Sequence, residues 1–249
     1  MITQLYLRLS GAEQEHYLGQ PITISGEDTG ISNVGLININ ISIMKLLNSI
    51  TRLQIRCAHN SNPLTGLPGN LIIEDQMKGA LAEERRFAIL YLDLDNFKAF
   101  NDKYGFERGD KALKVTAQVL QSSLANVGYG EEDFLGHIGG DDFIILTHPD
   151  IATQLCLAII SLFDREIKNL YNSCDRNRGF IEVKNRHGDT EEYPLMTISI
   201  AVVSNERRTF HNHLEIGEVA AELKKKAKEI QGSIWIEDQR WEDETDLDV

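Results

Sequence analysis

Residues 134–146 read FLGHIGGDDFIIL: two apolar runs joined by two glycines and two aspartates. Apolar runs on either side of a short glycine-containing turn predict a β-hairpin. Such a turn needs a glycine and at most one aspartate, so a second carboxylate adds like-charge repulsion and does nothing for the turn. Asp141 and Asp142 therefore indicate a site at the tip of this hairpin, and its other members have to come from elsewhere in the chain.

A second acidic cluster ends the run RFAILYLDLDNF at 86–97. The continuous apolar start of this run predicts a buried central strand, which ends at Asp93 and Asp95. One of these aspartates has an alternative role as the cap of the next helix. If the strand and the hairpin are neighbours in one sheet, Asp93 and Asp141 lie close together and repel each other. A divalent cation between them removes the repulsion, and hard oxygen ligands favour Mg²⁺ or Mn²⁺.

Candidate phosphate donors follow the acidic strand. The free N–H groups of Asn96, Phe97 and Lys98 would begin a helix there, and Lys98 adds a positive charge. Lys228, beside a small alanine on a later helix, is a second candidate for a phosphate contact. The neighbouring lysines at 224–226 are interpreted as a solvated basic face. The glycines of the hairpin would let the backbone approach such a ligand closely.

Asn101 and Asp110 are candidates for reading a nucleotide base. A carboxylate accepts hydrogen bonds from N1–H and N2–H₂ of guanine, and adenine offers no such pair of donors. A carboxamide can complement another edge of the base. Ordinary capping is the alternative, because Asp110 falls in the first turn of a predicted helix, where a carboxylate is favoured anyway.

Helical and strand patterns alternate over residues 60–237, which predicts a mixed α/β (α+β) domain with helices packed on a sheet. A second hairpin should turn near Gly188. Besides the hairpin strands and the strand at 86–97, we expect strands at 195–203 and 233–238, and helices at 71–84, 97–105, 108–127, 150–171 and 213–230.

Residues 33–59 form a predicted helical stem. From Leu36 to Cys57, apolar residues recur at alternating spacings of three and four, as in the seam of a coiled coil. Only about three heptads are present, so packing of the stripe onto the chain's own domain is an equal alternative. Residues 1–32 are an extension of unknown role, and the acidic tail at 238–249 is expected to be disordered.

The composition limits the partners. The net charge of −13 argues against nucleic acid and anionic membranes. Three widely spaced cysteines give no disulfide framework, and the chain shows no signal peptide, so we expect a cytoplasmic protein. The most apolar stretch, residues 34–47, is too short and too polar for membrane insertion.

Five motifs in order resemble the GGDEF family, the diguanylate cyclases. The resemblance covers about 60–237 and implies a nucleotide-cyclase palm-like fold, with a central, mostly antiparallel sheet flanked by helices. It also implies condensation of two GTP into cyclic di-GMP, with release of pyrophosphate, at the interface of a dimer. The motifs are NPLTGLPGN (62–70), YLDLDNFKAFNDKYGFERGD (91–110), GHIGGDDF (136–143), TISIAVV (197–203) and AAELKKKAKEIQGS (220–233).

The resemblance assigns roles to the residues already singled out. Asp93 and Asp141, with the Leu94 carbonyl, would bind the metal, and Asp141 or Asp142 would help to activate the 3′-hydroxyl. A homodimer through the N-terminal helix is expected and, if the chain is part of a longer protein, so is a sensory or effector domain. The remaining assignments are guanine to Asn101 and Asp110, phosphates to Asn96, Phe97, Lys98 and Lys228, and the signature turn to Gly139, Gly140 and Phe143.

Several positions depart from the family pattern. Asp142 replaces a glutamate, His137 replaces an arginine, and Ser233 replaces an arginine expected to touch phosphate. These changes keep two other functions open. The chain can be a degenerate domain that binds GTP and regulates a partner without turnover, or an interaction protein that works through its heptad helix.

Overall fold

The computed structural model describes residues 42–51, 60–184 and 188–241. The predictions for residues 1–32 and for the end of the acidic tail lie outside these ranges. The described residues fall into two units. Residues 42–51 form one helical segment, and everything from residue 60 onward belongs to the other unit. None of the helices in these ranges has the length and apolar character needed to cross a bilayer.

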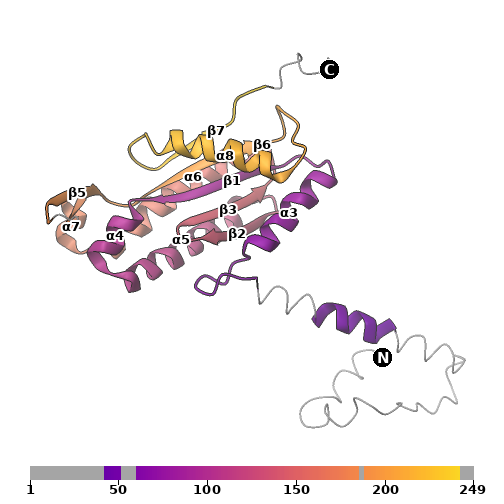
Figure 1. Cartoon of the computed structure of the whole chain (residues 1–249), viewed down its shortest axis with the longest axis horizontal. Helices are drawn as coiled ribbons and strands as arrows, with labels where there is room; N and C mark the ends of the chain where they lie inside the picture. The colour runs from indigo at the N-terminus through magenta and orange to yellow at the C-terminus, as the bar shows by residue number, and fades with distance from the viewer. Residues whose placement is uncertain (1–41, 52–59, 185–187, 242–249) are drawn as a thin grey trace, which may run out of the picture. The chain divides into compact units, whose positions relative to one another are not determined.

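A five-stranded sheet forms the centre of the larger unit (Figure 1). The strand order is β2-β3-β1-β6-β7, and every neighbouring pair is antiparallel except β6 and β7. The long apolar strands β1 and β6 lie inside the sheet, where both of their faces are covered. The strands are β1 (Ala88–Asp95), β2 (Phe134–Gly139), β3 (Asp142–Thr147), β6 (Thr197–Ser204) and β7 (Ile234–Glu237).

Helices cover both faces of this sheet. Helices α3 (Asn70–Ala82) and α8 (His213–Ala227) pack on one face. Helices α4 (Phe97–Tyr104), α5 (Phe106–Val127) and α6 (Pro149–Glu166) pack on the other face. The predicted mixed fold with a mostly antiparallel sheet between helices is therefore confirmed.

The alternation of side chains along β1 decides which layer each residue meets. Leu90 and Leu92 point into the core under α4, α5 and α6. Ile89 and Tyr91 face α3 and α8 instead. Asp93 continues this second series, so its carboxylate emerges on the face covered by α8.

A smaller hairpin, β4 (Phe180–Lys184) with β5 (Thr190–Pro194), forms a separate two-stranded sheet. It confirms the second hairpin predicted near Gly188. The helix preceding it is shorter than predicted, because α6 ends at Glu166 and tightens into a 3₁₀ turn, η1 (Ile167–Leu170). A short helix, α7 (Ser173–Arg178), follows and was not predicted, since its six residues are too few to show a period.

The helical segment at 42–51 carries the described part of the predicted heptad seam. The side chains of Ile43, Leu46 and Ile50 are 44%, 61% and 41% exposed. These three large apolar side chains have the spacing of the predicted seam. The rest of the predicted 33–57 seam lies outside the described residues.

Candidate active site

Asp93 and Asp142 lie directly opposite each other on β1 and β3. Asp93 is only 3% exposed. Like charges placed opposite each other on neighbouring strands are destabilising, and burial increases the cost. The sheet register therefore brings together the two acidic clusters of the sequence and requires a positive charge beside them.

Two lysines of the α8 segment supply that charge. Lys224 Nζ is 2.7 Å from Asp93 Oδ1 and also contacts Asp142 Oδ1. Lys228, one turn further on, places its Nζ 2.6 Å from Asp93 Oδ2. The interpretation of Lys224 as part of a solvated face is wrong, because α8 packs on the sheet face from which Asp93 emerges.

These contacts set the ionisation of the cluster. Burial alone would raise the pKa of Asp93, but hydrogen bonds from Lys224 and Lys228 outweigh it and hold that pKa below its ordinary value. Burial would likewise lower the pKa of Lys224, but its bonds to Asp142 and Asp93 raise it overall. Asp93 is thus a carboxylate and Lys224 an ammonium group at neutral pH.

Asp141 completes the cluster from the hairpin turn. One oxygen from each of Asp93, Asp141 and Asp142 lies within 4.8 Å of the others. Burial and the charge of Asp93 raise the pKa of Asp141, because no ion pair compensates it to the same degree. Three converging carboxylates are the hard ligands that Mg²⁺ and Mn²⁺ prefer, so the residues fit the expected metal.

The turn that presents Asp141 needs its two glycines. Gly139 and Gly140 both have positive φ, 148° and 58°, a region that residues with a Cβ rarely adopt. A methyl group on either would meet nothing within 4 Å. The backbone conformation is therefore what requires glycine here, and the space above both residues stays open to a ligand.

His137 holds the Gly139–Gly140 turn in place through contacts with Gly140 and Phe143, a role that was not predicted from the sequence. Its ring stacks on Phe143 with centroids 4.2 Å apart. Nε2 lies 3.0 Å from the Gly140 carbonyl, which can only accept, so Nε2 carries the proton. Nδ1 then accepts from the Thr65 hydroxyl at 3.0 Å. His137 thus joins the signature turn to the PLTGLP segment.

The strand end beside Asp93 leads directly into α4. Asn96 adopts a left-handed conformation, with φ of 62°, and makes no side-chain cap. Asp95 is not the cap either, because Thr197 and Ser199 donate hydrogen bonds to its carboxylate at 2.9 and 2.8 Å. The first N–H groups of α4 are left without a side-chain cap, as an anion-binding helix start requires.

Asn101 and Asp110 are connected through Gly109. The Asn101 amide packs so closely on Gly109 that a Cβ there would come within 1.8 Å of Oδ1. That oxygen is buried and accepts no hydrogen bond from the described residues. Asp110, the next residue of α5, is exposed. Asn101 therefore packs against the residue that precedes Asp110, and its Oδ1 is a buried acceptor without a donor among the described residues.

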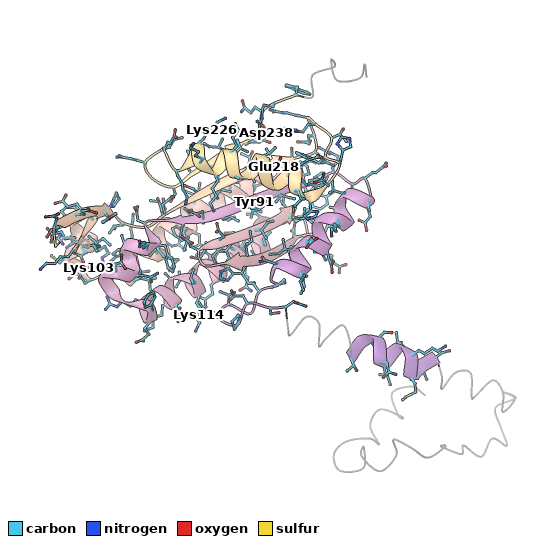
Figure 2. All side chains as sticks on the ribbon, in the orientation of Figure 1. Tyr91, Lys103, Lys114, Glu218, Lys226 and Asp238 are labelled. Carbon is cyan, nitrogen blue, oxygen red and sulfur yellow. The ribbon has the colours of Figure 1, made fainter. Side chains whose placement is uncertain are left out.

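Lys98 lies at the edge of a groove of about 670 Å³ between α4 and the β4–β5 hairpin. Lys103, labelled in Figure 2, bridges the two by donating to the Glu182 carbonyl at 3.1 Å. Asn96 also lines this groove. The β4–β5 hairpin thus forms one wall of a groove that two of the predicted phosphate donors also line.

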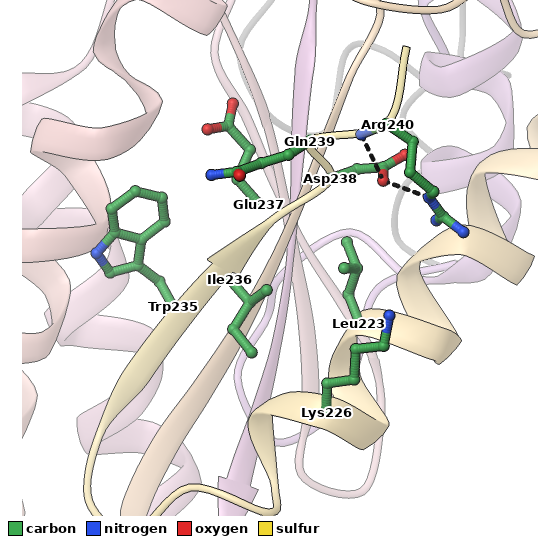
Figure 3. A pocket seen from close by; sticks show the side chains of 8 residues that line it. All are labelled: Leu223, Lys226, Trp235, Ile236, Glu237, Asp238, Gln239 and Arg240. Atoms are coloured by element: carbon green, nitrogen blue, oxygen red, sulfur yellow. Dashed lines mark hydrogen bonds and ion pairs between the residues drawn. The ribbon is translucent and has the colours of Figure 1, made fainter. Parts of the chain in front are cut away.

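A second hollow of about 530 Å³ lies between α8 and β7 (Figure 3). Lys226 and Leu223 line it from the helix, and Trp235 lines it from the strand. Arg240 closes one end by donating from Nε to Asp238 at 2.6 Å. None of the predicted site residues lines this hollow, so it is separate from the acidic cluster.

A mostly antiparallel sheet between helical layers, with an acidic hairpin tip beside an acidic strand end, defines a domain of the GGDEF type. Comparison with known families agrees: the family described as "Diguanylate cyclase, GGDEF domain" matches residues 59–231. The chain belongs to the GGDEF family, as its motifs predicted.

Curated relatives carry names from cyclic di-GMP metabolism. Diguanylate cyclase DgcS of Shewanella oneidensis is 33% identical over 125 residues, covering 48% of this chain and 40% of that protein. The bifunctional diguanylate cyclase/cyclic di-GMP phosphodiesterase MucR of Pseudomonas aeruginosa is 36% identical over 87 residues, covering 33% of this chain and 12% of MucR. The chain thus spans less than half the length of these two relatives.

Solved structures share the fold. Diguanylate cyclase SiaD of P. aeruginosa, solved with its activator SiaC, has a TM-score of 0.60 and 20% identity, covering 82% of this chain and 70% of that one. The coiled coil and GGDEF domain of DgcB from Caulobacter crescentus, in complex with c-di-GMP, has a TM-score of 0.55 and 17% identity, covering 82% and 97%.

One departure from the family pattern has a structural partner in this chain. Ser233, in place of an expected arginine, donates to Asp164 at 2.5 Å and accepts from the Ile198 N–H at 3.1 Å. It therefore ties the start of β7 to α6 and β6. A phosphate contact from this position would require the hydroxyl to give up its hydrogen bond to Asp164, because serine has a single proton to donate.

Proposed function

We propose that this chain is a diguanylate cyclase, which condenses two GTP into cyclic di-GMP with release of two pyrophosphates. The observation that carries the proposal is the convergence of Asp93, Asp141 and Asp142 within 4.8 Å, at the point where β1 runs into an uncapped helix start. Carboxylates in this setting suit a metal-bound triphosphate.

In the proposed site, Asp93 and Asp141 hold Mg²⁺ or Mn²⁺ together with the Leu94 carbonyl. When bound, the ion neutralises charge on the phosphates and polarises the reacting oxygen. Phosphate oxygens accept hydrogen bonds from the first N–H groups of α4, at Asn96, Phe97 and Lys98. Lys228, whose side chain is 46% exposed, has room to turn from Asp93 to a phosphate.

Cyclic di-GMP contains two phosphodiester bonds, and both form by the same step. The 3′-oxygen of one GTP attacks the α-phosphorus of the other, and the bond to the pyrophosphate leaving group breaks. Asp141, or Asp142 beside it, accepts the proton of the 3′-hydroxyl. Positioning and charge neutralisation supply most of the acceleration.

Guanine is read by Asn101 and Asp110. The Oδ1 of Asn101 is buried and lacks a donor among the described residues, so in the proposed complex the amide turns toward the base and accepts from a guanine N–H group. Asp110 accepts from N1–H and N2–H₂. Adenine has no such pair of donors and would leave these acceptors unsatisfied, which is costly.

Each subunit holds one GTP, so two sites have to face each other. We assign this pairing to the helix that includes residues 42–51, whose apolar stripe is exposed. We also propose a cytoplasmic location for the enzyme and, if the chain is part of a longer protein, a sensory or effector domain that sets its activity.

The test is incubation with GTP and Mg²⁺, followed by quantification of pyrophosphate and cyclic di-GMP. Product from the wild type that is lost in Asp141→Ala supports the proposal. Glu218→Ala, an exposed acidic residue of α8 labelled in Figure 2, is the charge-matched control and should keep full activity. Wild-type protein that binds GTP but forms no product contradicts it.

A GTP-binding regulatory domain without turnover is the second candidate. Two observations favour it: Lys224 and Lys228 already occupy the acidic cluster, and Asp142 is one methylene shorter than the usual glutamate. For this candidate, calorimetry would give guanine-selective GTP binding, and the same sample would release no pyrophosphate.

A further inference from the structure

Both oxygens of Asp93 already contact a cation. Lys224 Nζ is 2.7 Å from Oδ1, and Lys228 Nζ is 2.6 Å from Oδ2. The carboxylate itself is buried. Any divalent ion that binds Asp93 therefore competes with these ammonium groups for the carboxylate oxygens.

The two lysines are held differently. Lys228 follows the last residue of α8, is nearly half exposed, and contacts one carboxylate. The Lys224 side chain is 25% exposed and spans two carboxylates, Asp93 and Asp142, from neighbouring strands. Lys224 is thus the cation that holds β1 and β3 together at the site.

Lys224 also compensates the unfavourable register of the sheet. Asp93 and Asp142 are cross-strand partners, and without a cation their charges repel at close range. A lysine on the far side of α8 would not reach them. Lys226, two residues later, instead pairs with Glu222 at 2.9 Å on the outer surface of that helix.

We propose that Lys224 is a resident counter-ion of the acidic cluster, which a divalent ion has to displace from Asp93 and Asp142 in order to bind. The identity of the cluster as a metal site rests on the proposed function. Because the ion and the ammonium group compete for the same oxygens, the affinity for a divalent ion without nucleotide is weaker than three carboxylates alone would give.

The direct test is titration of nucleotide-free protein with Mn²⁺, with free Mn²⁺ followed by electron paramagnetic resonance. Lys224→Met should bind Mn²⁺ at least about tenfold more tightly than the wild type, since a competing positive charge is removed. Lys226→Met makes the same change in net charge on the same helix and should stay within about twofold of the wild type. Equal or weaker binding by Lys224→Met overturns the proposal.

Thermal unfolding covers the case in which Lys224→Met folds poorly. In EDTA this variant should melt below the wild type, because two carboxylates are left facing each other. Excess Mn²⁺ should raise its melting temperature by more than it raises that of the wild type. A Lys224→Met chain that Mn²⁺ does not stabilise, or stabilises no more than the wild type, also overturns the proposal.

These outcomes are separate from the test of turnover. Tighter Mn²⁺ binding by Lys224→Met, with no product from GTP in the wild type, would remove the cyclase assignment and keep the counter-ion. Product formation by the wild type, with unchanged Mn²⁺ affinity in Lys224→Met, would support the cyclase assignment and overturn the counter-ion proposal.

Discussion

The amide oxygen of Asn101 lies against Gly109, so close that a methyl group on Gly109 would come within 1.8 Å of it. Gly109 is buried in the first turns of α5, and Asp110 follows it on the surface. The glycine is therefore the residue that leaves room for the predicted base-reading amide.

Gly109→Ala should displace the Asn101 side chain and weaken binding of a non-hydrolysable GTP analogue at least about tenfold, because a hydrogen bond to the base is lost. Selectivity over the ATP analogue should fall with it. Calorimetry measures both affinities.

Gly79→Ala is the matched control. Gly79 lies within α3, and a methyl group there would meet nothing within 4 Å. This change should stabilise the protein by about 1 kcal/mol through helix propensity and leave GTP affinity unchanged. Wild-type GTP affinity in Gly109→Ala would remove Asn101 from base recognition.

Asp141→Asn should stabilise the ion-free protein. Burial and the charge of Asp93 raise the pKa of the Asp141 carboxyl in the folded state. The Asp141 carboxyl therefore makes its full contribution to the free energy of unfolding below its ordinary pKa. That contribution is lost as the pH rises through the pKa of the folded state. At pH 7 in EDTA, the neutral amide should raise the free energy of unfolding by about 1 kcal/mol in urea denaturation.

Asp93→Asn provides the opposite control on the neighbouring strand. This change breaks the ion pairs that lower the pKa of Asp93, so it should reduce the free energy of unfolding under the same conditions. If both variants changed the free energy of unfolding in the same direction, the lysines would not stabilise Asp93 in preference to Asp141, contrary to the contacts.

His137 predicts a loss of stability in acid. Burial lowers the pKa of its imidazole, and the hydrogen bond to the Gly140 carbonyl only partly offsets this. A depressed pKa gives stability that is present above the ordinary histidine value and lost as the pH falls through the folded value. The free energy of unfolding should fall less steeply from pH 7 to pH 5 in His137→Gln than in the wild type.

His211→Gln is the control for that pH series, since His211 is an exposed histidine before α8. It should leave the wild-type slope in place. An identical slope in all three proteins would mean that the buried imidazole accepts a proton without cost.

Leu46→Glu should prevent dimer formation through the N-terminal helix. Leu46 is the most exposed of the three seam residues described, and a charge in an apolar interface is unfavourable. Sedimentation velocity should give a dimer for the wild type and a monomer for Leu46→Glu. Asn48→Glu, off the seam on the same segment, should remain dimeric, and a monomeric wild type would contradict the assignment.

Hydrophobic patterning was sufficient to predict the hairpin, the central strand and the long helices. The acidic clusters meet because β1 and β3 are neighbours, a pairing that the apolar runs around Asp93 and Asp141 allow but do not specify. The prediction of a solvated face is wrong for Lys224, although the sequence carries a signal against it. Lys224 lies four residues before Lys228, so both belong on one helix face.

Other parts of the site depend on contacts that no local pattern encodes. The packing of Asn101 on Gly109 requires the angle at which α5 leaves Gly105 after α4. The bond from His137 to Thr65 joins residues 72 positions apart. Such long-range contacts follow from the assembled sheet and not from periodicity.

The central claim is that Asp93 and Asp141 bind a divalent ion beside a triphosphate at the start of α4. A crystal grown with Mn²⁺ and a non-hydrolysable GTP analogue tests it directly through the anomalous signal of manganese. The account predicts a manganese peak in contact with both carboxylates, with Lys224 moved away from Asp93. A bound nucleotide with no manganese between these residues, and with Lys224 still joining Asp93 to Asp142, would contradict it.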